Sequence, residues 1–239
     1  MSEADSHRSR LGNAAAAARS EVGGIAIILA AAIGLLGFLA VTDIVAGGAS
    51  TTLDHGLMAM LHPNGGSQAI GPAWLAQAAL DLTALGSITD LCVIAVLASA
   101  LFASGERWRE AVLLIAAPLS GVVILNIFKR VFDRPRPPLA LHAVVVGNAS
   151  FPSGHAMLSA VVYLTLGALL AHFAERARTK GFALVAGMVL TLAIGASRVY
   201  LGVHWPTDVI AGWALGAAWA MLWWLLVWFF ERRSEGRFS

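Results

Sequence analysis

The stretch GIAIILAAAIGLLGFLAVTDIVA, from Gly24 to Ala46, decides the fold class, because its only charged side chain is Asp43. A helix needs about 20 apolar residues to cross about 30 Å of bilayer hydrocarbon. A secretory signal peptide has a shorter apolar core, about 7–15 residues long, followed by a cleavage site. We therefore expect Gly24–Ala46 to be an uncleaved membrane span.

Five more apolar runs follow, each bounded by charged or turn residues. They predict further spans at Thr83–Ala103, Ala111–Phe128, His155–Phe173, Gly181–Gly202 and Pro206–Phe230. The composition agrees, because 58% of the 239 residues are hydrophobic and 13% are charged, against about 45–50% and about 25% in soluble proteins. The sequence therefore predicts an all-α polytopic membrane protein, a bundle of six transmembrane helices. It excludes a disordered chain and disfavours an ordinary soluble domain.

The distribution of Lys and Arg predicts the orientation of this bundle. Short cytoplasmic loops of membrane proteins are enriched in these residues. Most of the 16 basic residues lie in the segments that face the cytoplasm if the N-terminus is inside. We therefore expect a cytoplasmic segment at 1–22, a six-span domain at 23–230 and a cytoplasmic tail at 231–239. The basic residues left outside need a separate reason; they are Lys129, Arg130, Arg134, Arg136 and Arg198.

Polar residues that the spans do not explain gather where spans begin or end. They form four groups, Lys129–Pro137, Phe151–His155, Ser197–Arg198 and His204–Asp208. These groups follow the third span, open the fourth, close the fifth and open the sixth. In a chain that crosses the membrane six times, all four positions share one face. The orientation above makes this the outer face.

Such a collection of cations, two histidines and a carboxylate suits a phosphoryl group. Phosphoryl transfer is catalysed mainly by positioning and by stabilising negative charge on the oxygens, and arginine pairs two oxygens at once. Ser153 and Gly154 open a helix, whose N–H groups favour an anion. One histidine can attack phosphorus and a second can protonate the departing oxygen. Asp208 suits the role of the carboxylate that orients the attacking ring.

Three motifs carry a family resemblance: Lys129-x6-Arg136-Pro137, Pro152-Ser153-Gly154-His155 and Ser197-Arg198-x5-His204-x3-Asp208. They resemble the signature motifs of the type 2 phosphatidic acid phosphatases, a superfamily that also includes the vanadium haloperoxidases and glucose-6-phosphatase. All three motifs are complete and stand in the family's order.

This resemblance implies a role for each motif residue. His204 would be the nucleophile that forms a phosphohistidine, and Asp208 would orient it. His155 would be the acid toward the leaving group and would later help to activate water. The phosphate-binding residues would be Lys129, Arg136, Ser153, Gly154 and Arg198. The family needs no metal and no cofactor, and the sequence has no Cys and His spacing typical of a zinc site.

We therefore predict an integral membrane lipid phosphatase with no nucleic-acid partner. Undecaprenyl pyrophosphate is the first candidate substrate, followed by phosphatidylglycerophosphate and phosphatidic acid. The small size, the alanine-rich composition and the outward site favour a multi-pass enzyme of a bacterial inner membrane, with its active site facing the periplasm.

Alternatives remain open at this point. A lipid phosphotransferase would use the same motif residues, and a vanadate haloperoxidase belongs to the same superfamily. A lipid or ion transporter would use the carboxylates in or near the first two spans, Asp43, Asp81 and Asp90. Arg134 is either a cation for a second phosphate or a solvated side chain. The tryptophans of the last span, Trp219, Trp223, Trp224 and Trp228, predict an interfacial aromatic belt.

Overall fold

The computed structural model describes residues 3–48, 50–147 and 149–235, with side chains for 23–48, 52–147 and 149–230. The described residues form helices and connecting loops, without β-strands. The order is α1 (Glu3–Ala46), α2 (Ser50–Leu61), α3 (Ala73–Ala84), α4 (Ile88–Ser104), α5 (Trp108–Phe132), η1 (Leu139–Leu141), α6 (Gly154–Ser159), η2 (Ala160–Leu164), α7 (Thr165–Phe173), α8 (Ala177–Tyr200) and α9 (Pro206–Glu235). The predicted all-α membrane fold is confirmed. The predicted cytoplasmic segments at 1–22 and 231–239 fall partly outside this description. The structure leaves out residues 1–2 and 236–239, and it gives no side chains for 1–22 and 231–239.

Five helical segments in the described residues are long and apolar enough to cross a membrane. They are Gly23–Ala46, Trp108–Phe132, Gly154–Phe173, Ala177–Tyr200 and Pro206–Phe230. The pair α3 and α4 passes the same test together but bends by 54° at a short break, and it makes a sixth crossing if the two helices count as one broken span. The expectation of a continuous span at Thr83–Ala103 is therefore wrong, since that run contains the end of α3, the break and α4.

Local hydrogen bonds explain this break. Ser87 caps the start of α4, and its Oγ accepts the N–H of Asp90 at 3.1 Å. The carbonyl oxygen of Leu85 accepts the hydroxyl of Tyr163 at 2.8 Å. Tyr163 lies in η2, a π-helical turn inside the span Gly154–Phe173. A backbone group left free by the bend is thus satisfied from a neighbouring span, as a membrane interior requires.

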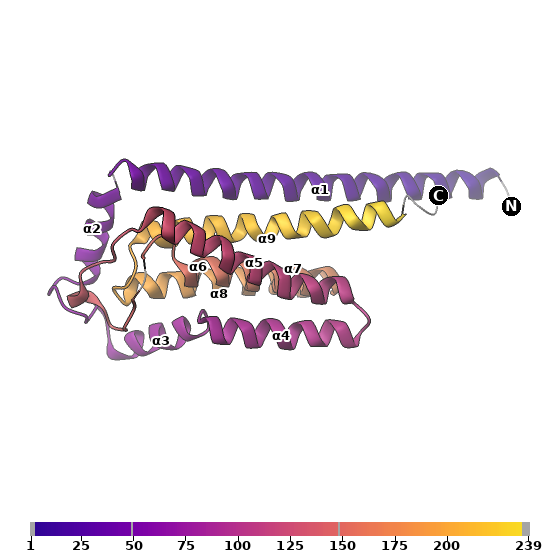
Figure 1. Cartoon of the computed structure of the whole chain (residues 1–239). Helices are drawn as coiled ribbons and strands as arrows, with labels where there is room; N and C mark the ends of the chain where they lie inside the picture. The colour runs from indigo at the N-terminus through magenta and orange to yellow at the C-terminus, as the bar shows by residue number, and fades with distance from the viewer. Residues whose placement is uncertain (1–2, 49, 148, 236–239) are drawn as a thin grey trace.

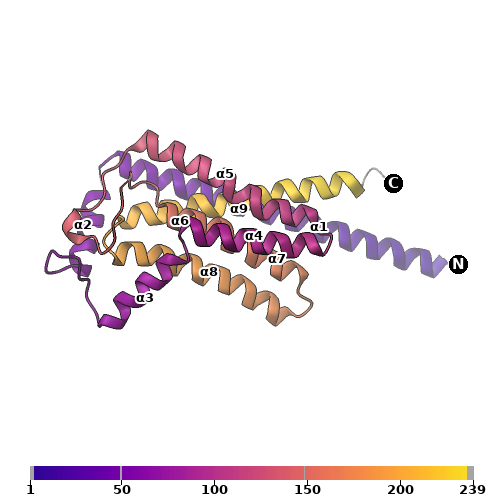
Figure 2. The same cartoon turned by 60° about the horizontal axis from the view of Figure 1, so that its bottom comes forward.

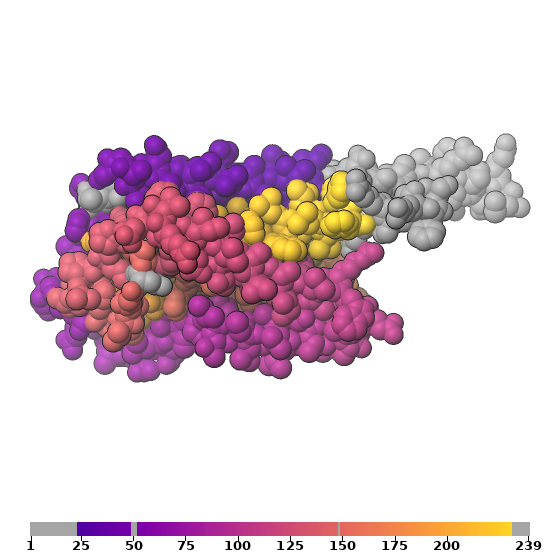
Figure 3. All heavy atoms as spheres, viewed as in Figure 1, coloured from indigo at the N-terminus to yellow at the C-terminus, as the bar shows by residue number. Residues whose placement is uncertain are grey.

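The helices run side by side, and the two ends of the bundle differ. α2 and the loops that follow α5 and α8 gather at one end, and both termini lie at the other (Figures 1 and 2). α1 packs along α9. In the space-filling view the region around the α5–α6 connection spreads over the end opposite the termini (Figure 3). The four motif groups of the sequence all belong to this end.

Small residues bring α9 against α6. Gly212, Gly216 and Ala220 recur at a spacing of four residues along α9. A Cβ atom added at Gly216 would lie 2.4 Å from the carbonyl oxygen of Met157, and one at Gly212 would lie 2.7 Å from that of Ser153. Small residues at this spacing allow the backbones of membrane helices to approach closely. The helix that carries Asp208 is thereby held against the helix that carries His155.

Two tryptophans of α9 connect this helix to α5. The indole N–H of Trp219 donates to Ser120 Oγ at 3.1 Å, and that of Trp223 donates to the same oxygen at 3.0 Å. Ser120 lies within α5, so these two rings join α9 to α5 inside the bundle. Both tryptophans are half-buried, and α5 supplies the acceptor that each indole N–H needs; the interfacial aromatic belt stays a prediction.

We predict that Gly216→Ala lowers the free energy of unfolding by about 1–3 kcal/mol, because the added methyl group forces α6 and α9 apart. The matched control is Gly181→Ala, since a Cβ atom at Gly181, also in a helix, meets nothing within 4 Å. Thermal unfolding of both variants in the same detergent measures the difference. Equal unfolding midpoints would contradict the proposed backbone contact.

Candidate active site

A cavity of about 400 Å³ opens at the end of the bundle opposite the termini. Its polar lining consists of Lys129, Arg136, His155, Arg198 and His204. Gly154 also lines it, together with apolar side chains that include Ile88, Leu125 and Leu158. Residues of four spans, together with residues of the loops between them, thus line one cavity. It lies at the end of the bundle that the sequence predicted.

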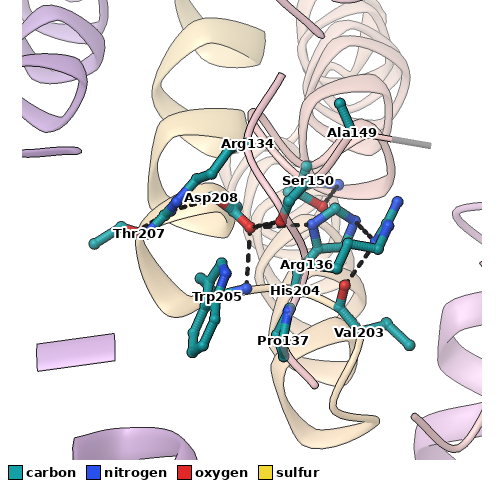
Figure 4. A network of polar contacts seen from close by, with 12 residues as sticks. Arg134, Arg136, Pro137, Ala149, Ser150, Val203, His204, Trp205, Thr207 and Asp208 are labelled. Atoms are coloured by element: carbon teal, nitrogen blue, oxygen red, sulfur yellow. Dashed lines mark hydrogen bonds and ion pairs between the residues drawn. The ribbon is translucent and has the colours of Figure 1, made fainter. Parts of the chain in front are cut away.

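His204 presents one ring nitrogen to this cavity and the other to a carboxylate. The ring is 2% exposed and lies in the loop just before α9. Its Nδ1 is 3.4 Å from Asp208 Oδ2, and its Nε2 is 3.1 Å from an Arg136 nitrogen (Figure 4). Because arginine is only a donor, Nε2 is an acceptor and the ring proton sits on Nδ1. The unprotonated Nε2 is the nitrogen available for chemistry.

The surroundings of His204 keep the ring neutral. Burial lowers its pKa to about 4; Asp208 opposes this effect, and the charges of Arg136 and Arg198 add to it. An ordinary histidine has a pKa near 6.5. At neutral pH the imidazole is therefore uncharged, which is the form that can act as a nucleophile.

Asp208 lies in the first turn of α9 and is fully buried. Its Oδ2 accepts the backbone N–H of Trp205 at 3.0 Å and the hydroxyl of Ser150. Its Oδ1 accepts from Arg134 at 2.5 Å. Both carboxylate oxygens are thus hydrogen-bonded by groups from different parts of the chain (Figure 4). Burial of a carboxylate is tolerated when it is paired and hydrogen-bonded in this way.

Arg134 is not the solvated side chain that was one of the two roles considered from the sequence, because it is 12% exposed and paired. Its guanidinium forms ion pairs with Asp208 and, at 2.7 Å, with Asp54 on α2. Asp54 is 1% exposed and also accepts the backbone N–H and the hydroxyl of Thr207, at 3.0 Å and 2.7 Å. Sequence reasoning missed Asp54, which stands in an expected outer loop with no motif around it.

The three cations of the cavity come from different elements. Lys129 ends α5 and donates to the carbonyl oxygen of Ala149, whereas Arg136 follows in the loop and donates to that of Val203 at 2.6 Å. Arg198 of α8 donates to Thr83 Oγ1 at 2.7 Å. Its Nε is buried and has no hydrogen-bond partner in the described part of the chain. Three positive groups around one cavity favour an anion there.

The turn before α6 positions His155 and Gly154. Ser153 caps α6 through its Oγ, and its backbone N–H donates to the carbonyl oxygen of Asp208 at 3.0 Å. Ser153 is fully buried and is not among the cavity-lining residues, whereas Gly154 and His155 are. Gly86 lies against His155, since a Cβ atom there would be 3.2 Å from its ring. The break between α3 and α4 therefore leaves room for the His155 ring.

The carboxylates considered for a transport pathway lie elsewhere. Asp43 and Asp81 are exposed on α1 and α3, and Asp90 is half-buried in the first turn of α4. None of the three lines the cavity. Among the residues that the structure describes, no group of three or more His, Cys, Asp or Glu side chains could hold a metal ion.

Comparisons with known proteins agree with the motifs and the fold. The PAP2 superfamily profile matches residues 110–232. Phosphatidylglycerophosphatase B of Bacillus subtilis is 31% identical over 145 residues, 60% of this chain and 70% of that protein. An undecaprenyl-diphosphatase of Sulfolobus acidocaldarius is 32% identical over 118 residues, 47% of this chain and 53% of that protein, so the match spans only about half of its length.

A solved structure extends the similarity to most of the chain. The crystal structure of the transmembrane PAP2 type phosphatidylglycerolphosphate phosphatase from Bacillus subtilis matches with a TM-score of 0.72 and 28% identity. The match covers 85% of this chain and 96% of that protein. The sequence profile, the relatives and the fold agree, and the chain belongs to the PAP2 superfamily.

Proposed function

We propose that this chain is a lipid phosphatase that transfers a phosphoryl group from a membrane lipid to His204 and then to water. The observation that carries the proposal is the geometry of His204. Its Nε2 faces a cavity lined by three cations, and its Nδ1 faces a buried carboxylate. That arrangement combines an activated nucleophile with charge stabilisation.

The first step forms a bond between His204 Nε2 and phosphorus and breaks the bond between phosphorus and the leaving oxygen. Asp208 accepts the Nδ1–H and stabilises the positive charge that develops on the ring. His155, on the cavity wall, donates a proton to the leaving oxygen. In the second step His155 takes a proton from water, the water oxygen attacks phosphorus, and phosphate leaves His204.

Lys129, Arg136 and Arg198 bind the phosphoryl oxygens in this proposal. Arg136 already contacts His204 Nε2 and shifts its donors to the phosphoryl group as the group arrives. Burial lowers the pKa of Arg136, yet the side chain stays a cation, because arginine is not deprotonated in proteins. The backbone N–H of Gly154 adds a donor at the start of its helix. Ser153 contributes through its backbone, by holding this turn against Asp208.

A membrane lipid is the substrate class that the site suits. The cavity lies at the end of the spans and combines charged residues with apolar ones. The names of the relatives point to phosphatidylglycerophosphate and undecaprenyl diphosphate. We propose these two as substrates, with phosphatidic acid next. Arg134 is paired with Asp54 and Asp208, so its contacts give no support to a separate site for a second phosphate.

The first prediction concerns the chemistry. Purified protein in detergent with EDTA is expected to release phosphate from at least one of these lipids, because the proposed site uses no metal. His204→Ala is expected to lower the rate at least about 10³-fold, since it removes the nucleophile. His172→Ala, which changes a ring packed on Phe173 far from the cavity, is the control.

Two outcomes would contradict this prediction. Activity of His204→Ala at the control rate would exclude His204 as the nucleophile. Phosphate that leaves the lipid but appears on an added acceptor lipid, and not in solution, would instead indicate a phosphotransferase with the same site.

The second prediction concerns pH. Because the pKa of His204 is about 4, protonation of this ring should leave the rate of its phosphorylation unchanged between pH 7 and pH 5 and should slow it below about pH 4. Single-turnover phosphorylation of the protein at each pH measures this rate, and ³¹P NMR separates the titration of the substrate. An acid limb near pH 6.5 would mean that the ring has an ordinary pKa.

The third prediction concerns orientation. We propose cytoplasmic termini and a periplasmic site in a bacterial inner membrane. In support, the loops 105–107 and 174–176, with Arg107 and Arg176, lie at the end of the bundle that holds the termini. In a Cys92→Ala background, Gly65→Cys should react with an impermeant maleimide in intact cells, and Lys180→Cys only after lysis. The reverse pattern would invert the topology.

A further inference from the structure

We infer that Asp54 and Arg134 are positioning residues, which hold Asp208 in the orientation that His204 requires. The inference rests on the proposed function. The two side chains form a bridge in which one guanidinium joins two buried carboxylates: Arg134 donates to Asp54 Oδ2 at 2.7 Å and to Asp208 Oδ1 at 2.5 Å. The bridge connects α2, the loop after α5 and the start of α9.

The hydrogen bonds of Asp208 explain why it needs this support. One of its oxygens, Oδ2, accepts the hydroxyl of Ser150 and the backbone N–H of Trp205, and it also faces Nδ1 of His204. The other, Oδ1, accepts from Arg134 (Figure 4). Rotation of the carboxylate would change the 3.4 Å separation between Oδ2 and His204 Nδ1. A donor on Oδ1 opposes that rotation, so Arg134 acts on His204 through Asp208.

The negative charge of Asp54 balances the positive charge of Arg134. Arg134 by itself would reduce the negative potential with which Asp208 stabilises a positively charged His204 ring. The carboxylate of Asp54, 1% exposed, neutralises the guanidinium at Nη2, whereas Asp208 contacts Nη1. The carboxylate of Asp208 therefore gains a fixed donor and keeps its electrostatic effect on the ring.

Asp54 also holds the segment that carries Asp208. Its Oδ1 accepts the backbone N–H of Thr207, and its Oδ2 accepts the hydroxyl of Thr207. Thr207 lies in the first turn of α9, where backbone N–H groups lack partners within the helix. A carboxylate at this position also suits the positive end of the helix. The same side chain thus positions both the helix start and the arginine.

A purely structural role would have a different signature. Removing one partner of a buried ion pair commonly destabilises a protein by about 3–5 kcal/mol, and such a loss would lower the amount of folded enzyme without changing its chemistry. The test therefore makes two comparisons. One is the turnover rate of each folded molecule. The other is the acid limb of the pH profile, which is the pH at which the phosphorylation rate falls as His204 is protonated. The groups that face His204 itself, namely Asp208, Arg136, Arg198 and His155, stay unchanged.

The experiment uses three variants of the full chain in detergent. Asp54→Asn removes one of the two carboxylates that pair with Arg134, and Arg134→Met removes the guanidinium that donates to Asp54, Asp208 and Thr207. The double variant restores the charge balance without restoring the donor on Oδ1. Asp81→Asn is the matched control, because Asp81 is an exposed carboxylate on α3 that contacts Gln77. Size-exclusion profiles and unfolding midpoints give the folded fraction of each protein.

We expect kcat for the folded enzyme to fall by about 10- to 100-fold in all three variants, by analogy with the loss seen when the group that supports a metal ligand is removed. KM should change less than about 3-fold, because Lys129, Arg136 and Arg198 are intact. The acid limb should move to lower pH in Asp54→Asn and to higher pH in Arg134→Met. In the double variant it should return to the wild-type position while kcat stays low.

Several outcomes would overturn the inference. Wild-type kcat in the folded fraction of Asp54→Asn and Arg134→Met would make the bridge merely structural. So would acid limbs that do not move, or that move in the same direction in both single variants. An inactive wild-type protein would instead refute the proposed function, whereas an active wild type with unaffected variants would refute only the positioning role.

Discussion

The buried carboxylate of Asp208 is the constraint on which the rest of the site depends. A negative charge inside a membrane protein is costly unless it is paired and hydrogen-bonded. Here its partners come from the loop before α6, the loop before α9 and the loop after α5. To satisfy one carboxylate the chain must bring these loops together, and doing so also brings His204 and Arg136 to the same cavity.

Close backbone contact preserves this arrangement. Gly212 and Gly216 let α9 touch α6, so the relation between Asp208 and His155 depends on rigid helices more than on flexible side chains. Arg198 is held by another helix, since it donates to the hydroxyl oxygen of Thr83 at the end of α3. The bend between α3 and α4 thus contributes to the site, because it places Thr83 beside Arg198 and leaves Gly86 against His155.

The sequence was informative where the signal is local. Long apolar runs identify spans because a bilayer demands them, and the motif around Lys129 and Arg136 has a spacing that can be read directly. The break at Gly86 was missed although the pair Gly86-Ser87 marks it, with a turn residue followed by the residue that caps α4. The acceptor of the indoles of Trp219 and Trp223 could not be predicted, because that acceptor, Ser120, belongs to another helix. Arg134 was noticed, but its partner Asp54 stands 80 residues earlier.

By itself the sequence determined the fold class, the number of crossings when the bent pair counts as one, the family, and the end of the bundle at which the polar motifs meet. These follow from hydropathy, from span counting and from short motifs, all of which are properties of neighbouring residues. Only the tertiary structure decided the bent crossing, the tautomer of His204, the exclusion of Ser153 from the cavity lining and the bridge from Asp54 to Asp208. Those features depend on contacts between segments far apart in the chain, and the energy of a buried charge depends on which groups the fold brings to it.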